Sequence, residues 1–441
     1  MGADIFITEE EAGMTEYKDM DVGEMRELYD ELARQYERYC ALGLELNMAR
    51  GKPSPAQLEL SMPLLDCVNS EADYLADDGT DCRNYGVLAG LPEARALIAD
   101  MLDVTPEQVV ICGGSSLNIM FDTIARAWIT GLGGQTPWSK LDNVKFICPS
   151  PGYDRHFAIC EHFGIEMIPI ELGEDGPDVA EIARLVTDPA VKGIWCVPQY
   201  SNPCGYTYSD EVVRGLAALE PAASDFRIFW DNAYAVHHLY DEPENQDHVL
   251  NIIDACAEAD HPDMVFEFCS TSKVTFPGAG ISAFVSSVAN VNEMLASMGA
   301  QTIGFDKFNQ LRHVRFLKDA ESVAAHMNKH AELLRPRFER VLEIFDEDLG
   351  GTGIGTWTHP RGGYFISFTG LDGTAKETVA KAKKAGVALT GAGATWPYGN
   401  DPHDSNIRIA PSFPSIEELE QAARIFTVCA RMTALEKLME K

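Results

Sequence analysis

The sequence predicts an α/β fold, with a large domain built on a mostly parallel, seven-stranded sheet and a smaller α+β domain. Two observations predict this fold. From about residue 109 to residue 287, short apolar segments rich in β-branched residues alternate with amphipathic segments, which is the pattern of a parallel sheet covered by helices. The chain has 441 residues. A single domain usually has roughly 100–200 residues, so two domains are expected.

Seven short apolar segments are the strand candidates, and helical periodicity is clearest over residues 115–129. Polar residues follow several of these strands directly. Because open α/β sheets bind ligands beyond the carboxyl ends of their strands, a functional site is expected there. The predicted strands are residues 109–113, 145–148, 167–171, 193–197, 227–230, 265–269 and 281–286.

The pattern changes after about residue 318. A long helical segment over residues 319–345 leads to strand-like segments near 363–368 and 407–409, and a closing helix starts at Ser415. These elements predict a separate α+β unit.

The N-terminal residues are expected to join this unit. Residues 22–42 have helical periodicity, and residues 46–55 are extended. We therefore predict a large domain over residues 61–318 and a small domain made of residues 1–60 together with 319–441.

The composition limits the classes of partner. Asp and Glu number 68 against 35 Lys and Arg, a formal net charge of -33, which repels nucleic-acid backbones and anionic lipid surfaces. No segment approaches the ~20 apolar residues that span a bilayer, and the N-terminus does not resemble a signal peptide. We predict a cytoplasmic protein with neither nucleic acid nor a membrane as partner.

The cysteines agree with a reducing compartment. All 11 are scattered, and no Cys-x-x-Cys pair occurs. This usage is typical of buried thiols, not of a disulfide framework or a zinc site, so no metal site is predicted.

The first candidate catalytic residue is Lys273, which follows the strand at 265–269 in the sequence Ser270-Thr271-Ser272-Lys273. A lysine in a glycine-rich loop at a strand end can be held partly desolvated, and its amine is then a nucleophile towards carbonyl groups. Taken alone, a surface-loop lysine is the simpler interpretation.

Asp231 and Tyr234 follow the apolar strand at 227–230. A buried carboxylate at that place needs a cationic partner, because an isolated buried charge is costly. A protonated pyridine nitrogen is one such partner. The alternative role for Asp231 is an N-cap of the next helix.

Asn202 lies in a proline-bracketed turn, Asn202-Pro203-Cys204-Gly205, after the strand at 193–197. Its amide can donate a hydrogen bond to a phenolate-like oxygen, and Tyr234 can supply a second donor to the same atom. The alternative is a purely structural turn.

Gly114, Ser115 and Ser116 lie between the strand at 109–113 and a helix. Free backbone N–H groups and two hydroxyls at a helix start form an anion site suited to phosphate. A serine N-cap is the alternative, and the two interpretations are compatible.

Tyr153 and Arg408 complete the set. Tyr153 follows the strand at 145–148, where its ring can stack on a flat ligand, and Arg408 can hold a carboxylate with its planar fork. A core tyrosine and an internal salt bridge are the alternatives. Together, the motifs supply every group that one cofactor and its substrate need: phosphate cradle, ring stack, oxygen donors, ring-nitrogen acid, lysine and arginine.

With these motifs, the chain resembles the class I/II aminotransferases, which are fold-type I pyridoxal-phosphate enzymes, over nearly its whole length. The shared motifs are the Asn-Pro-x-Gly turn, the Asp-x-x-Tyr after a strand, the Ser-x-Ser-Lys, a Pro-x-Gly-Gly at residues 360–363 and the late strand arginine. The resemblance implies the type I fold of pyridoxal-phosphate-dependent transferases, with pyridoxal 5'-phosphate as a Schiff base on Lys273.

Two more segments carry the resemblance. Tyr85, in Asn84-Tyr85-Gly86, resembles the tyrosine that reaches across a dimer interface to the neighbouring cofactor phosphate, which implies a homodimer. Gly51, in Arg50-Gly51-Lys52-Pro53, resembles a substrate-side glycine.

The chain departs from the family pattern at the phosphate. Members usually have a phosphate-binding arginine seven or eight residues after the lysine, but those positions are Gly280 and Ile281 here. Backbone amides, four serines and an arginine or tyrosine elsewhere are then expected to hold the phosphate. The serines are Ser115, Ser116, Ser270 and Ser272.

The lysine loop, Lys-x-Thr-Phe-Pro-Gly-Ala-Gly, resembles an aspartate-aminotransferase-like subgroup. This implies transfer of an amino group from aspartate to 2-oxoglutarate, that is, an amino acid and a 2-oxo acid as substrates.

A lyase or decarboxylase on the same fold is the main alternative, since fold and cofactor do not fix which bond breaks. A cofactor-binding regulatory module is disfavoured by the acidic charge. The substrate side chain is read by one of four candidates or by none of them. The candidates are Arg50, Arg312, Arg315 and Arg361.

Overall fold

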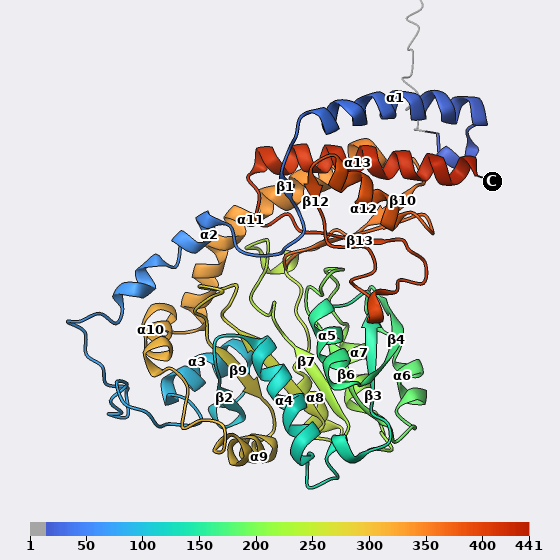
Figure 1. Cartoon of the computed structure of the whole chain (residues 1–441). Coiled ribbons are helices and arrows are strands. Elements are labelled where there is room, and N and C mark those ends of the chain that lie inside the picture. The colour runs from blue at the N-terminus through green and yellow to red at the C-terminus, as the bar shows by residue number, and fades with distance from the viewer. Residues whose placement is uncertain (1–14, 441) are drawn as a thin grey trace, which may run out of the picture.

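The computed structural model describes residues 15–440, which form three separate sheets and the helices around them (Figure 1). The large sheet has eight strands in the order β2-β9-β8-β7-β6-β3-β4-β5. Their bounds are β2 Val109–Ile111, β3 Lys145–Ser150, β4 Glu166–Gly173, β5 Gly176–Pro177, β6 Val191–Cys196, β7 Arg227–Asp231, β8 Val265–Ser270 and β9 Ser282–Val285.

All seven predicted strands are present in the large sheet. The eighth, β5, is a two-residue strand that pairs with the end of β4, and its Gly-Pro sequence gives no strand signal. The pairs among β3, β4, β6, β7 and β8 are parallel. Because β9 is antiparallel to both β8 and β2, β2 points the same way as the parallel strands.

The large sheet is covered by helices on both faces, as expected for parallel strands that are buried on both sides. All six residues of β6 are buried. Along β2, Val109 and Ile111 belong to one core and Val110 to the other. One face packs against α4 (Ser116–Thr130), α5 (Asp154–Phe163) and α9 (Val288–Met298), and the other against α3 (Pro92–Leu102), α6 (Val179–Leu185), α7 (Asp210–Ala217), α8 (Ile252–Glu258) and α10 (Lys307–Leu317).

The C-terminal region forms its own layers beyond one end of the large sheet (Figure 1). Three antiparallel strands make a small sheet in the order β10-β11-β13. The elements are α11 Ala320–Leu349, β10 Gly355–Trp357, β11 Ile366–Gly370, α12 Ala375–Lys384, β13 Asn406–Ile409 and α13 Ile416–Met439.

The N-terminal residues pack with these C-terminal elements. Helix α1 (Val22–Ala41) lies along α13 (Figure 1), and β1 (Leu46–Asn47) pairs in parallel with β12 (Val387–Ala388). One core joins α1, α11 and α13. The domain boundaries at residues 60 and 318 stay a prediction.

Two expected strand-like segments are shorter or displaced. The extended segment over 46–55 pairs only at β1, and helix α2 already starts at its end, over Pro55–Glu59. The strand expected near 363–368 begins later, at Ile366. Gly363 has a left-handed φ of 77°, and a Cβ on Gly362 would meet the Tyr200 ring at 2.2 Å, so both glycines belong to a tight loop.

Short 3-10 helices fill several connections, and their bounds are Tyr17–Asp19, Met62–Asp66, Pro106–Gln108, Trp138–Lys140, Pro243–Asn245 and Pro397–Gly399. Within the described residues, no helix combines the length and the apolar character needed to cross a membrane.

Candidate active site

The carboxyl ends of β2, β3, β6, β7 and β8 meet at one edge of the large sheet, the edge that faces the C-terminal elements (Figure 1). The predicted polar residues follow these strands. The sheet therefore brings together side chains that are up to about 160 positions apart in the sequence, as expected for an open α/β sheet.

Lys273 lies in the loop after β8 and is half-buried. Its Nζ is 4.8 Å from the ring centroid of Tyr234 and 5.9 Å from that of Tyr364. The Tyr364 hydroxyl accepts a hydrogen bond of 3.0 Å from Gln57 Nε2. The half-buried lysine thus lies over two aromatic rings, an environment that differs from that of a fully exposed loop lysine.

Asp231 is the last residue of β7 and is only 2% exposed. Its Oδ2 lies 3.0 Å from His156 Nε2. A carboxylate only accepts, so His156 Nε2 carries the hydrogen. The other oxygen, Oδ1, is buried and has no hydrogen-bond partner among the described residues. Leaving such an atom unpaired is costly, which points to a donor that binds there.

Two aromatic side chains hold His156 in place. Its ring stacks on Trp195 of β6, with the centroids 4.3 Å apart and the planes 9° apart. Tyr153, three residues earlier, meets the same imidazole edge-on at 5.0 Å. The stacking fixes the orientation of the His156 N–H group, and so fixes which oxygen of Asp231 is left without a partner.

Tyr153 immediately precedes α5 and faces the same group of residues. Burial raises the pKa of its hydroxyl to about 12, and the charges of Lys273 and Asp231 act on it in opposite directions. Burial also raises the pKa of the Tyr234 hydroxyl. Both phenols therefore stay protonated at neutral pH and can donate hydrogen bonds.

Arg408 of β13 links the C-terminal sheet to the strand ends. Its Nη1 donates to Asn202 Oδ1 and to Asp154 Oδ1, both at 3.1 Å, and its Nη2 donates to Thr390 Oγ1 at 3.1 Å. Arg408 Nε is buried without a partner among the described residues. Because the Asn202 oxygen faces Arg408, the Asn202 amide nitrogen remains available as a donor.

The residues predicted to hold a phosphate lie in two neighbouring loops. Ser115 is the N-cap of α4, but its side chain makes no capping hydrogen bond, so the simple N-cap interpretation does not account for it. Ser116 is the first residue of α4. Ser272 Oγ donates to Gly114 O at 3.3 Å, and Ser270 Oγ lies 3.2 Å from Ser272 Oγ. The hydroxyls of Ser270 and Ser272, at the end of β8 and just after it, therefore lie beside the loop that precedes α4.

Arg312 of α10 lies next to this cradle. Its Nε donates to Asn309 Oδ1 at 2.8 Å, and Asn309 Nδ2 donates to Gly280 O at 2.8 Å. Gly280 packs closely on Gly114, since a Cβ on Gly280 would be 3.2 Å from Gly114 O. No carboxylate within residues 15–440 forms an ion pair with Arg312.

Two other predicted residues, Gly51 and Tyr85, do not lie among the residues at the strand ends. A Cβ on Gly51 would be 2.4 Å from the Phe365 ring, and the Arg408 guanidinium lies 4.8 Å over that same ring. Gly51 is thus beside the arginine. Tyr85 is 80% exposed and is not brought to the other predicted residues of its own chain.

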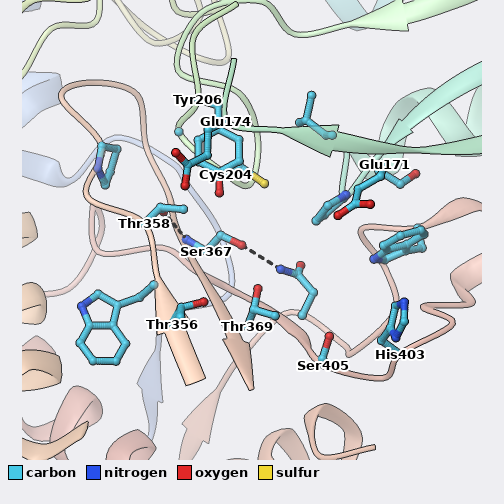
Figure 2. A pocket seen from close by; sticks show the side chains of 18 of the residues that line it. Glu171, Glu174, Cys204, Tyr206, Thr356, Thr358, Ser367, Thr369, His403 and Ser405 are labelled. Carbon is cyan, nitrogen blue, oxygen red and sulfur yellow. Dashed lines mark hydrogen bonds between the residues drawn. The ribbon is translucent and has the colours of Figure 1, made fainter. Parts of the chain in front are cut away.

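A separate cavity of about 770 Å³ lies between the C-terminal sheet and the loops after β3 and β6 (Figure 2). In its wall, Asn406 Nδ2 donates to Ser367 Oγ at 2.8 Å. The lining includes Glu171 and Glu174 but neither Lys nor Arg, and it excludes Lys273 and Asp231. The cavity is therefore distinct from the predicted site.

Comparison with known proteins agrees with this geometry. The sequence profile described as aspartate amino-transferase matches residues 20–441. A relative from Corynebacterium glutamicum, named aspartate aminotransferase, is 46% identical over 421 residues, which cover 95% of this chain and 96% of the relative. The chain belongs to the aspartate aminotransferase family. It is a transaminase, and its substrates are an amino acid and a 2-oxo acid.

Solved structures of the family support the fold. The crystal structure of an aspartate transaminase from Corynebacterium glutamicum has a TM-score of 0.93 and 45% identity, and the match covers 96% of this chain and 99% of that one. An α-aminoadipate aminotransferase from Thermus thermophilus, complexed with N-(5'-phosphopyridoxyl)-L-leucine, has a TM-score of 0.71 over 92% of this chain at 18% identity. The predicted type I fold is thereby confirmed.

Several contact partners of the predicted site residues were not predicted from the sequence. His156 and Asp154 lie one to three positions after Tyr153, so proximity to a predicted residue was the available signal. Gln57 and Thr390 had no signal, because only tertiary contacts bring them to Tyr364 and Arg408.

Proposed function

We propose that this aminotransferase moves an amino group from aspartate to 2-oxoglutarate, with pyridoxal 5'-phosphate held by Lys273. The observation that carries the proposal is Asp231, whose buried Oδ1 has no partner among the described residues while Oδ2 is held by His156. A protonated pyridine nitrogen fits such an oxygen. The family uses this cofactor, and the named relatives act on aspartate.

When bound, the cofactor supplies an aldehyde that condenses with amines and a pyridine ring that takes up electrons. The residues present fit it. Asp231 would keep the ring nitrogen protonated, Tyr153 would stack on the ring, and the Asn202 amide nitrogen and the Tyr234 hydroxyl would donate to the ring oxygen. The cradle of serine hydroxyls and backbone amides would hold the phosphate. Its members are Gly114, Ser115, Ser116, Ser270 and Ser272.

The other residues bind the substrate and move its protons. Arg408 would hold the α-carboxylate through those guanidinium N–H groups that are not already bonded to Asn202, Asp154 or Thr390. This contact would orient the α-carbon. Lys273 Nζ, which would hold the cofactor, would also act as the acid–base group that takes up and holds the proton of the substrate α-carbon. Positioning of this kind and general acid–base catalysis are the main contributions of the chain.

The proposed substrates are tested by a panel of amino donors with 2-oxoglutarate as acceptor. We expect aspartate to give the highest kcat/KM and glutamate to accumulate in equal amount to oxaloacetate. Release of ammonia or of CO2 without transfer of the amino group would instead indicate the lyase or the decarboxylase.

Arg312 is the residue we assign to the phosphate, in place of the arginine missing at positions 280 and 281. Replacing it with Gln should raise the Kd for pyridoxal phosphate by about 10–100-fold, because a charge-assisted hydrogen bond contributes about 1.5–3 kcal/mol. The affinity for pyridoxal, which has no phosphate, should not change. Cofactor titration of the apoprotein by fluorescence measures both values.

Arg315→Gln is the matched control, since Arg315 lies on the same helix and donates to Cys67 O and Asp73 O. An equal loss of affinity for pyridoxal and for pyridoxal phosphate in Arg312→Gln would contradict the assignment.

We also propose a homodimer. Exposed apolar side chains lie near Tyr85. The segment that carries them contacts the residue after Tyr85, because Gly304 is in close contact with Gly86 and Lys307 Nζ donates to Gly86 O at 3.1 Å. Ile303 is 61% and Phe308 37% exposed. A second copy that covers this surface would let Tyr85 reach the cofactor phosphate of the partner. Sedimentation velocity measures whether the protein is a dimer in solution.

We also propose a cytoplasmic location. The 11 free thiols fit a reducing compartment.

A further inference from the structure

Arg408 has an acidic partner that the proposed chemistry does not use. Asp154 Oδ1 is 3.1 Å from Arg408 Nη1, the same nitrogen that donates to Asn202. No other carboxylate of the described residues lies within 4 Å of this guanidinium. The arginine that should bind substrate carboxylates is therefore already paired with a carboxylate of its own chain.

The pair has a physical reason in the protein without substrate. The Arg408 side chain is only 9% exposed, and a buried guanidinium without a counter-charge is costly. Asp154 supplies the counter-charge from the first residue of α5, where the helix dipole favours negative charge, and its side chain is 33% exposed. Asp154 thus stabilises Arg408 between turnovers.

The same contact opposes the substrate. A carboxylate that binds Arg408 adds a second anion beside one cation, and the two anions repel each other in a poorly solvated site. We propose that Asp154, acting through Arg408, weakens carboxylate binding there, so that the 2-oxo acid formed in one half-reaction and the amino acid formed in the other dissociate readily. The inference rests on the proposed role of Arg408.

Asp154→Asn tests this inference, because the amide keeps an oxygen acceptor for Arg408 and removes only the charge. The probe is succinate, a dicarboxylate without amino or oxo group, titrated into the cofactor-loaded enzyme by calorimetry. We expect the Kd to fall about tenfold, and the KM for 2-oxoglutarate to fall with it. Glu161→Gln, which removes an exposed charge from the same helix, should leave both constants unchanged.

The sign of the change separates the inference from a purely structural role. If Asp154 only held Arg408 in position, Asp154→Asn would bind succinate equally or more weakly, and either result would overturn the inference while the proposed function stands. Asp154→Ser serves the same test if the amide variant does not fold. Absence of succinate binding by the wild-type enzyme would overturn the role of Arg408 as well.

Discussion

Replacing Lys273 with Ala should lower kcat by about four orders of magnitude or more. The substitution removes the group that we propose as both the nucleophile for the cofactor and the acid–base group for the α-proton. General acid–base catalysis alone contributes about 10²–10⁴-fold. Steady-state transamination of aspartate measures the loss. Borohydride treatment followed by intact mass measurement provides a second readout, since it should attach the cofactor to the wild-type chain and not to the variant.

The control for this substitution is Lys145→Ala. Lys145 starts β3 at the opposite edge of the sheet, where it pairs with Asp188 at 3.1 Å, so its loss should leave kcat unchanged. Lys273→Arg keeps the positive charge and should still be inactive. A Lys273→Ala enzyme that turns over at the wild-type rate would refute the proposed mechanism.

Replacing Asp231 with Asn should lower kcat by about 10²–10³-fold, with little change in the fold. A preorganised group of this kind typically contributes that amount, and the neutral amide cannot keep the pyridine nitrogen protonated. The amide oxygen can still accept the hydrogen bond from His156, so that contact is kept. Single-turnover kinetics and thermal unfolding measure the two effects separately.

Glu267→Gln is the matched control for Asp231. Glu267 is a buried carboxylate on the neighbouring strand β8, and it accepts a hydrogen bond of 2.9 Å from Asn232 Nδ2. Burial raises its pKa to about 7, so the amide differs little from the half-protonated acid at neutral pH. We expect unchanged turnover. If Asp231→Asn had as little effect as Glu267→Gln, the assignment of Asp231 to the cofactor would fail.

Much of the large sheet could be predicted because its signal is local. Buried parallel strands appear as continuous apolar segments, and β6 and β7 are buried at every position. β5 could not be predicted, since only its partner strand β4 makes two residues of Gly and Pro into a strand. The late start of β11 depends likewise on the packing of Gly362 against Tyr200.

The residues of the proposed site likewise include some that could be predicted from the sequence and some that could not. Residues that follow strands, such as Lys273, Asp231 and Asn202, could be predicted because topology places all parallel strand ends at one edge. The contact partners of these residues could not. Gln57 reaches Tyr364 across 307 positions, and Asp154 reaches Arg408 across 254.

The sequence by itself determined the α/β class, the order of the strands along the chain and the residues at their ends, because apolar periodicity and short motifs are properties of neighbouring residues. Only the tertiary structure decided which oxygen of Asp231 is left without a partner, which arginine lies beside the phosphate cradle and which acid pairs with Arg408. Those features depend on distances between segments that are remote in the chain, and such distances are set only when the helices and sheets have packed.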